Sequence, residues 1–286
     1  MTSPRNRKSC FNDSRSCVTK RSRTATSSRR SRKRSPDDAG GPLSEPWFIA
    51  PVEDWNGSEI TLPHDESHHA LRVLRIEPPA VVTVTDGKGN VARAAASRVV
   101  DDRLVVEILD REERRRATPE IVVYQAAAKG HKLDDAVQCL TELGVAEFWV
   151  FESSRSIVKW DRNKVERLNG RWNSIARSAA KQSRNAYLLR AGGGLSWTET
   201  VRRVAAEPLA CVLWEGATIP LRTTLVGGAE RVAVVVGPEG GLAREEAESL
   251  ADAGAQLASL GPLILRTEHA PVVAASALMF HYGLIG

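Results

Sequence analysis

Two glycine-rich segments near the carboxyl end of the chain have the spacing with the clearest chemical meaning. Gly-Pro-Glu-Gly-Gly occupies 237–241, and Gly261-Pro262 follows further along. Glycine removes the side chain where the backbone must approach another strand or a flat ligand closely. One such turn is more often structural, but a second loop that carries Arg266 and Glu268 favours a binding site.

The composition of the two loops limits the ligand. Neither loop has the lysine and hydroxyl pair that cradles phosphates with magnesium, nor the Gly-x-Gly-x-x-Gly spacing of a dinucleotide fold. The sequence therefore predicts a nucleoside-like ligand without a polyphosphate. The scattered cysteines Cys10, Cys17, Cys139 and Cys211 suit neither a disulfide framework nor a zinc site, and we expect no metal.

Each loop follows a short apolar run. Residues 232–236 are mostly β-branched and end at the first loop, which is typical of a buried strand. A helix is expected at 243–253, because the acidic residues of its first turns complement the positive end of the helix dipole. Residues 258–260 precede the second loop, and Pro271 opens an alanine-rich final helix, since proline fits the first turn of a helix. The two loops should form one site.

The pair of segments at 237–242 and 260–268 resembles the signature of the bacterial small-subunit ribosomal RNA uridine-N3 methyltransferases, which belong to the SPOUT superfamily. The resemblance runs from about Pro46 to the carboxyl terminus. It implies an α/β fold, in which a small N-terminal PUA-like β-barrel domain precedes a SPOUT α/β domain with a C-terminal trefoil knot. S-adenosylmethionine would lie bent in the knot loops. General topology rules count against a knot, so only the resemblance suggests one.

The resemblance implies methylation of N3 of a specific uridine in 16S ribosomal RNA, and with the charge pattern it indicates the site residues. The cofactor-binding positions are Leu213, Trp214, Glu215, Val236, Gly237, Pro238, Glu239, Gly240, Gly241, Leu260, Gly261, Leu265, Arg266 and Thr267. The RNA-binding positions are His69, Arg72, Arg75, Lys129, Arg155, Arg177, Lys181 and Arg184.

Methylation at N3 needs geometry and charge more than a strong nucleophile, because N3 must lose its proton before or as the methyl group arrives. Placing the two reacting atoms in line supplies most of the effect. Arg266, a permanent cation with a planar donor fork, is the candidate to stabilise charge on the uracil oxygens. Glu268, or a water that it holds, is the weaker candidate to receive the proton.

Two other functions remain open. One is a SPOUT methyltransferase that acts on a ribose 2′-hydroxyl or on another base. The other is a ribosomal RNA-binding assembly protein without catalysis. The intact glycine loops favour an enzyme, since a pure binder would be free to fill them with side chains.

The chain has 286 residues, of which 42% are apolar, and is long enough for two ordinary domains. Residues 1–35 hold twelve Lys or Arg against Asp13 alone, so the other 28 basic and 34 acidic residues leave the rest mildly acidic. The predicted parts are a disordered basic tail at 1–45, a PUA-like RNA-binding β-barrel at 46–110, an arginine-rich linker at 111–119 and a SPOUT methyltransferase domain at 120–286.

The basic tail has almost no aliphatic residues, so it cannot bury enough apolar surface to order itself. It could be a tail that grasps RNA, an organelle transit peptide, or the product of a start site assigned too far upstream. We favour the last interpretation. No apolar run is long enough for a secretory signal or a membrane span, and we expect a cytoplasmic protein.

The first domain should consist mostly of strands. They are expected at 47–49, 59–62, 80–84, 91–96 and 103–108, with a short helix at 64–74 and a hairpin turn at 86–89. Asp65 or Ser67 could cap the helix, which presents His69, Arg72 and Arg75. Such charges usually form a solvated face, whereas the matching helix of the family grips RNA. The two arginines would then contact phosphates.

The second domain should alternate strands and helices, which implies a parallel sheet with right-handed crossovers. Strands are expected at 121–127, 148–151, 209–213 and 231–236, with helices up to Leu143 and at 163–182. Leu133, Ala136, Val137 and Leu140 give the first of these helices its apolar face, and Gly144 ends it.

Ten basic residues and only two acidic ones lie between Arg155 and Arg190. On a helix, residues four apart share a face, so the charge forms a stripe. An ordinary solvated helix would alternate signs, so we favour RNA as the partner. The chain departs from the family here, with Lys181 where glutamate is common and a different segment at 185–189.

The final helix, expected at 270–284, is apolar nearly all round, which predicts burial on several sides. Its small residues permit close helix contact, and the family pairs two subunits through this region. We therefore expect a homodimer, with 16S ribosomal RNA in an assembled small ribosomal subunit as the other partner.

Overall fold

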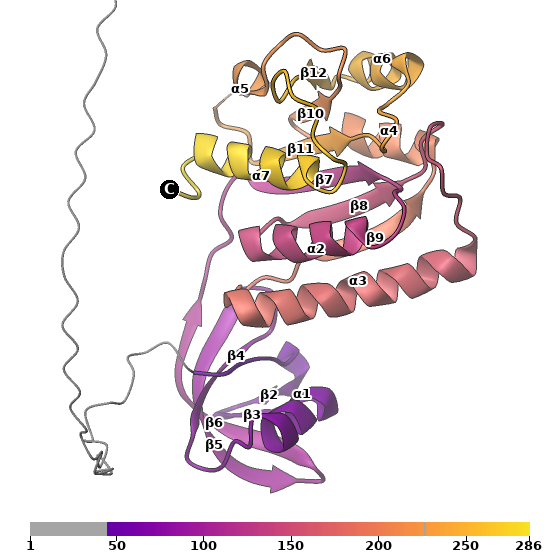
Figure 1. Ribbon diagram of the computed structural model, residues 1–286. Coiled ribbons are helices and arrows are strands. Elements are labelled where there is room, and N and C mark those ends of the chain that lie inside the picture. Colours follow the sequence, from indigo (N-terminus) through magenta and orange to yellow (C-terminus); the bar gives the residue numbers. More distant parts are fainter. Residues whose placement is uncertain (1–44, 226) are drawn as a thin grey trace, which may run out of the picture. The chain divides into compact units, whose positions relative to one another are not determined.

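The computed structural model describes residues 45–225 and 227–286 (Figure 1). The prediction of a disordered basic tail therefore lies outside the described residues, except at Glu45. The described chain builds two six-stranded sheets. None of its helices combines the length and the apolar character that crossing a membrane requires.

The first sheet is antiparallel except where β1 and β4 pair, and its order is β1-β4-β5-β6-β3-β2. Its strands are β1 (Trp47–Ile49), β2 (Trp55–Asn56), β3 (Glu59–Thr61), β4 (Val81–Thr85), β5 (Asn90–Val100) and β6 (Arg103–Glu113). The short helices are η2 (Val52–Asp54), α1 (His64–His68) and the π-helical η3 (His69–Val73). Alternate strand residues such as Phe48, Ile60 and Val84 share one core.

Two details of the first sheet differ from the prediction. β6 continues to Glu113, inside the stretch predicted to be loop, because its charged residues extend the ladder with β5 as far as Asn90. The predicted caps of α1 are also wrong, since Pro63 is the N-cap and offers no side-chain bond. Ser67 instead donates to the carbonyl of Leu62 at 3.0 Å.

The second sheet is entirely parallel, in the order β12-β10-β11-β7-β8-β9. Its strands are β7 (Glu120–Ala126), β8 (Glu147–Phe151), β9 (Arg190–Leu195), β10 (Ala210–Leu213), β11 (Arg231–Val236) and β12 (Gln256–Ala258). Its helices are α2 (Lys132–Leu143), α3 (Arg162–Ser183), α4 (Trp197–Ala205), α5 (Leu221–Thr224), α6 (Arg244–Asp252) and α7 (Ala270–His281). The predicted strands and helices of this region are confirmed, and β9, α4, α5 and β12 are additional.

Helices cover both faces of the second sheet (Figure 1). Ile121 and Val123 of β7 join a core with α2, α3 and α7, whereas Val122 and Tyr124 join a core with α4 and α6. A parallel sheet buried on both faces needs continuous apolar strands, which explains the valine-rich sequence of β11.

The final helix differs from its prediction. α7 ends at His281, and only one of its sides is buried, where Ala274 and Ala275 face the core. Val273 is 42% exposed and Phe280 is 72% exposed. The prediction that α7 is buried on several sides is therefore wrong for the single chain. One side of the helix packs on the core, and no described residue covers the side that carries Val273 and Phe280.

Ion pairs and a backbone hydrogen bond connect the region of the first sheet to the region of the second. Glu66 of α1, which is 1% exposed, accepts bonds from Arg177 at 3.3 Å and from Lys181 at 3.1 Å, both on α3. The hairpin between β4 and β5 also reaches the second sheet, since the amide of Leu188 donates to the carbonyl of Gly87 at 2.9 Å. The segment at 185–189 is thus part of this junction.

We predict that Glu66→Ala lowers the free energy of unfolding by about 2 kcal/mol, because two cations lose their shared, buried partner. Urea unfolding of the purified chain measures this change. Glu77→Ala, at an exposed position, is the control and should change stability little. Equal stability of the Glu66 and Glu77 variants would contradict the role of Glu66 in the junction.

Candidate active site

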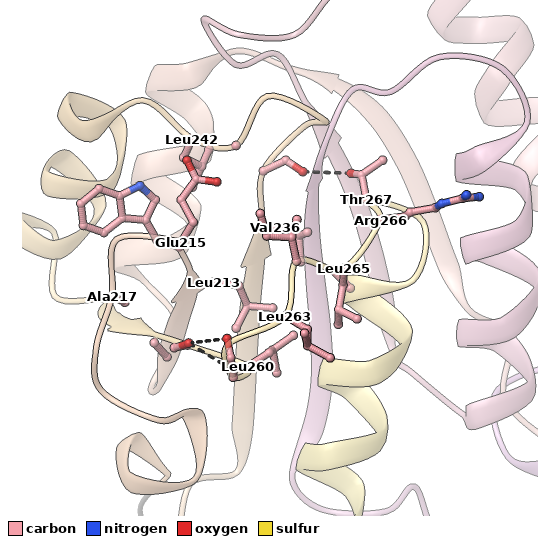
Figure 2. Close-up of a pocket in the computed structure, with 18 of the residues that line it drawn as sticks. Leu213, Glu215, Ala217, Val236, Leu242, Leu260, Leu263, Leu265, Arg266 and Thr267 are labelled. Atoms are coloured by element: carbon pink, nitrogen blue, oxygen red, sulfur yellow. Dashed lines mark hydrogen bonds between the residues drawn. The ribbon is translucent and has the colours of Figure 1, made fainter.

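Three neighbouring strands end level with one another at one edge of the second sheet. Leu213 of β10 pairs in register with Val236 of β11 and Ala258 of β12. The segments that follow these strands therefore meet, and they enclose a cavity of about 930 Å³ (Figure 2). Ligands of open α/β sheets bind outside the carboxyl ends of the strands, and this volume is typical of small-molecule sites.

The cavity contains nearly all of the predicted cofactor positions. Its lining includes Leu213, Trp214, Glu215, Val236, Gly237, Pro238, Glu239, Gly241, Leu260, Gly261, Leu265, Arg266 and Thr267. Gly240 is the exception and does not line the cavity. Its carbonyl instead accepts a bond from Arg155 Nη1 at 3.1 Å.

The glycines that do line the cavity serve two purposes. Gly241 has a φ of +68°, and a Cβ there would lie 3.0 Å from Glu215 Oε2, so this glycine lets a carboxylate approach the first loop. Gly261 has a φ of +124°, and a Cβ there would meet no atom within 4 Å. The second loop thus presents bare backbone at a position that lines the cavity.

Apolar side chains form much of the cavity wall. Figure 2 shows Leu213, Val236, Leu260, Leu263 and Leu265 around the same space, where they come from two strand ends and from the second loop. An apolar wall beside bare glycine backbone suits a flat ring system that carries little charge.

A charged cluster lies next to the first loop. Lys132 Nζ, which lines the cavity, is 2.8 Å from Glu239 Oε1 and 3.9 Å from Glu268 Oε2. Burial acts to raise the pKa of Glu239, but bonds from Lys132 and from backbone N–H groups outweigh it and hold this pKa below its ordinary value. Glu268 Oε2 is buried and has no hydrogen-bond partner among the described residues. The predicted proton acceptor therefore lies beside a cation of the cavity.

Arg266 is one of the residues that line the cavity. The residue is exposed, and Figure 2 shows its guanidinium directed away from Leu213 and Leu260. The donor fork thus points out of the cavity, where a second substrate could meet it.

The predicted RNA-binding residues fall into three places. The backbone N–H of Lys129 donates to Glu239 Oε1 at 3.4 Å, and Arg155 contacts Gly240, so both lie beside the first loop. His69 and Arg72 lie in η3, and Arg75 follows it, in the segment between β3 and β4 of the first sheet. His69 packs edge-on against Phe48, with 6.4 Å between ring centroids, while the two arginines are exposed.

The basic stripe of α3 is less free than its sequence indicates. Arg177 and Lys181 hold Glu66, and Arg171 lies 2.7 Å from Asp134 Oδ2. Arg184 ends α3 with a φ of +57°. The acids that balance the stripe come from α1 and α2, so counting charges within one helix could not find them.

Two polar residues in or beside the site, Lys132 and Gln125, were not among the predicted positions. Lys132 follows the carboxyl end of the first strand of the parallel sheet. Ligand-binding residues often occur at such positions, so this position could have indicated its place in the site. Gln125, a polar residue inside the apolar run of β7, is buried beneath both loops and bonds to Gly237 and Thr267.

Comparisons with known proteins give a consistent result. The profile of the RNA methyltransferase domain family matches residues 115–279. The chain is 35% identical over 226 residues to the ribosomal RNA small subunit methyltransferase E of Mycobacterium bovis, covering 78% of this chain and 86% of the relative. It is 31% identical to the protein of the same name from Bacillus subtilis, covering 77% and 90%.

Two solved structures resemble the chain closely. One is a methyltransferase from Legionella pneumophila in complex with its cofactor SAM, with a TM-score of 0.75, 29% identity, and coverage of 83% of this chain and 98% of the other. The second is a ribosomal RNA small subunit methyltransferase E from Neisseria gonorrhoeae bound to S-adenosyl methionine, with a TM-score of 0.72, 28% identity, and coverage of 83% and 98%.

We predict that Lys132→Met raises the pKa of Glu239, because the ammonium that favours the ionised form is removed. A lowered pKa in the folded state stabilises the chain above the ordinary pKa of glutamate, and this gain is lost as the pH falls through the folded value. The variant should therefore lose less stability in acid than the wild type. Carboxyl NMR titration measures the pKa, and Lys129→Met, which keeps its backbone bond to Glu239, is the control. An unchanged pKa of Glu239 in Lys132→Met would refute the assignment.

Proposed function

The chain belongs to the family of ribosomal RNA small subunit methyltransferases E, and from this premise we propose that it methylates N3 of a specific uridine in 16S ribosomal RNA. It is an S-adenosylmethionine-dependent ribosomal RNA methyltransferase, like the family to which it belongs. The observation that carries the proposal is the cavity at the level strand ends, where both glycine loops and an apolar wall come together.

The residues of the cavity suit S-adenosylmethionine. The apolar wall of Leu213, Leu260 and Leu265 can take a flat adenine ring, and the open space at Gly261 leaves room for it against the backbone. Glu215 and Glu239 in the lining supply negative charge for a cationic ligand. We propose that the lining residues named above hold the cofactor, without Gly240.

S-adenosylmethionine supplies a methyl group on a positively charged sulfur. The chain must orient uridine N3 toward that methyl group and assist the loss of the N3 proton. Arg266, whose fork points out of the cavity, would stabilise negative charge on the uracil oxygens. Glu268, next to Lys132, is the proposed proton acceptor.

We also propose the finer features of the fold that the family implies. The first sheet would be the PUA-like RNA-binding barrel, and the chain from the second loop into α7 would form the trefoil knot. The path of the chain supports a knot, since β12 lies at the sheet edge beyond β10, whereas Thr267 bonds to Gly237 after β11 and to Gln125 on β7. The domain limits at 46–110, 111–119 and 120–286 remain predictions.

A homodimer is part of the proposal. Val273, Ala277 and Phe280 form an exposed apolar face on α7, and Leu263 and Ile264 of the second loop are 81% and 89% exposed. Apolar surface of this kind typically marks an interface. The exposed arginines in and just after η3, Arg72 and Arg75, would contact phosphates of 16S ribosomal RNA within the small subunit, in the cytoplasm.

Methyl transfer from labelled S-adenosylmethionine to isolated small ribosomal subunits tests the function. Nucleoside mass spectrometry should find the label in 3-methyluridine of 16S ribosomal RNA. Label in a 2′-O-methylated nucleoside or in another base would support a different SPOUT reaction. Binding of subunits without any transfer would support an assembly protein.

We predict that Gly261→Val abolishes S-adenosylmethionine binding while the chain stays folded, because the new side chain would occupy the cavity. Gly254→Val is a matched control, since Gly254 also has a positive φ, +99°, with no atom within 4 Å of its Cβ position, and lies outside the cavity. Backbone strain of about 1 kcal/mol is thus common to both variants. Calorimetry that finds equal affinity in the two variants would place the ligand elsewhere.

We predict that Arg266→Ala lowers the rate at saturating substrates on the order of a hundred- to a thousandfold, because a donor that acts mainly in the transition state is lost. Cofactor affinity should change little. Arg266→Lys should restore only part of the rate, since a point charge cannot reproduce the fork. Arg222→Ala, at an exposed position of α5, is the control. If Arg266→Ala transfers the methyl group at the wild-type rate in single-turnover experiments, Arg266 has no role in the chemical step.

A further inference from the structure

Gln125 is a polar side chain in the middle of the apolar second sheet. It belongs to β7, pairs in register with Val236 of β11, and is fully buried. Its neighbours along the strand, Tyr124 and Ala126, pack in an apolar core. A buried amide at this position needs an explanation, because leaving any of its polar atoms without a partner costs free energy.

The amide of Gln125 ties both glycine loops to the sheet. Its Nε2 donates to the carbonyl of Gly237 in the first loop at 3.2 Å and to Thr267 Oγ1 after the second loop at 2.7 Å. Thr267 Oγ1 in turn donates to the same carbonyl at 3.0 Å, drawn as a dashed line in Figure 2. Three chain segments that are far apart in sequence thus share one closed set of hydrogen bonds.

The donors in this triangle have only one consistent arrangement. The carbonyl of Gly237 can only accept, so the nitrogen side of the amide must face it, and the hydroxyl of Thr267 must also donate to it. Thr267 then accepts from Gln125 with a lone pair. The positions of Gly237 and Thr267, both of which line the cavity, are therefore set relative to β7.

The other end of the amide has no partner. Gln125 Oε1 is buried and accepts no hydrogen bond from any described residue. A buried acceptor without a hydrogen bond lowers the stability of the folded chain. An apolar side chain of the same shape at position 125 would therefore make the chain equally stable or more stable. Stability alone therefore does not account for a glutamine at this position.

We propose that Gln125 is a positioning residue for the methyl transfer, which holds the two loops in the one relative placement that binds S-adenosylmethionine. This inference rests on the proposed function of the cavity. Gln125 does not line the cavity and would act through Gly237 and Thr267, which do. A loop that is already fixed before binding does not lose conformational freedom when the ligand binds. The hydrogen bonds of Gln125 should therefore increase the affinity for S-adenosylmethionine.

The test compares Gln125→Met with the wild type. Methionine keeps the length of the side chain and removes both donor bonds, while Thr267 still satisfies the carbonyl of Gly237. The dissociation constant for S-adenosylmethionine should rise about tenfold, the effect of losing roughly one net hydrogen bond. The melting temperature and the KM for small subunits should stay near the wild-type values, which separates positioning from folding and from RNA binding.

Gln138→Met is the matched control, since Gln138 is exposed on α2 and bonds only to Glu142 in the described chain. Thr267→Val removes the other member of the triangle and should weaken cofactor binding in the same direction. The effects of Gln125→Met and Thr267→Val should not add in the double variant, because both break one network.

Four results would overturn the proposal. Unchanged cofactor affinity in Gln125→Met would remove its positioning role and leave the function of the cavity intact. A melting temperature lower by many degrees, or a variant that does not fold, would make Gln125 a structural residue. Additive effects in the double variant would show that Gln125 acts apart from Thr267. Wild-type protein that does not bind S-adenosylmethionine would overturn the proposed function together with this inference.

Discussion

The register of the second sheet is the constraint on which the site depends. Leu213, Val236 and Ala258 end their strands level with one another, and Gln125 of β7 stands beside Val236. The loops that follow β11 and β12 begin side by side, so their backbones come close together. Glycine, which has no side chain, allows this close approach, and both loops contain it. A strand shifted by one residue would turn every side chain to the opposite face and move its loop out of the cavity.

The first sheet is coupled to this site through α3. Arg171 of α3 lies 2.7 Å from Asp134 on α2, the helix that also carries Lys132 beside the first loop, and the later turns of α3 hold Glu66 of α1. A substrate that contacts both sheets would meet the exposed Arg72 of η3, Arg75 just after it, and the mouth of the cavity. Lys181 contributes here to cohesion of the chain by pairing with Glu66.

Local pattern predicted the elements better than it predicted their contacts. The β-branched run of β11 and the apolar face of α2 could be read from periodicity, and both glycine loops line the same cavity. Partners across the chain could not be found in this way. The charge of Lys181 is balanced by Glu66, more than a hundred residues away, and Gln125 meets Thr267 only because the sheet is folded. The exposed side of α7 was missed because an apolar helix does not reveal how many of its sides a single chain covers.

The most direct test of the account is the methylation state of 16S ribosomal RNA in cells from which the gene is deleted. Mass spectrometry of the isolated RNA should show that 3-methyluridine is lost at one position. A plasmid that carries the wild-type gene should restore the modification, and one that carries Arg266→Ala should not. Persistence of 3-methyluridine in the deletion strain, or loss of a different methylated nucleotide, would contradict the proposed reaction.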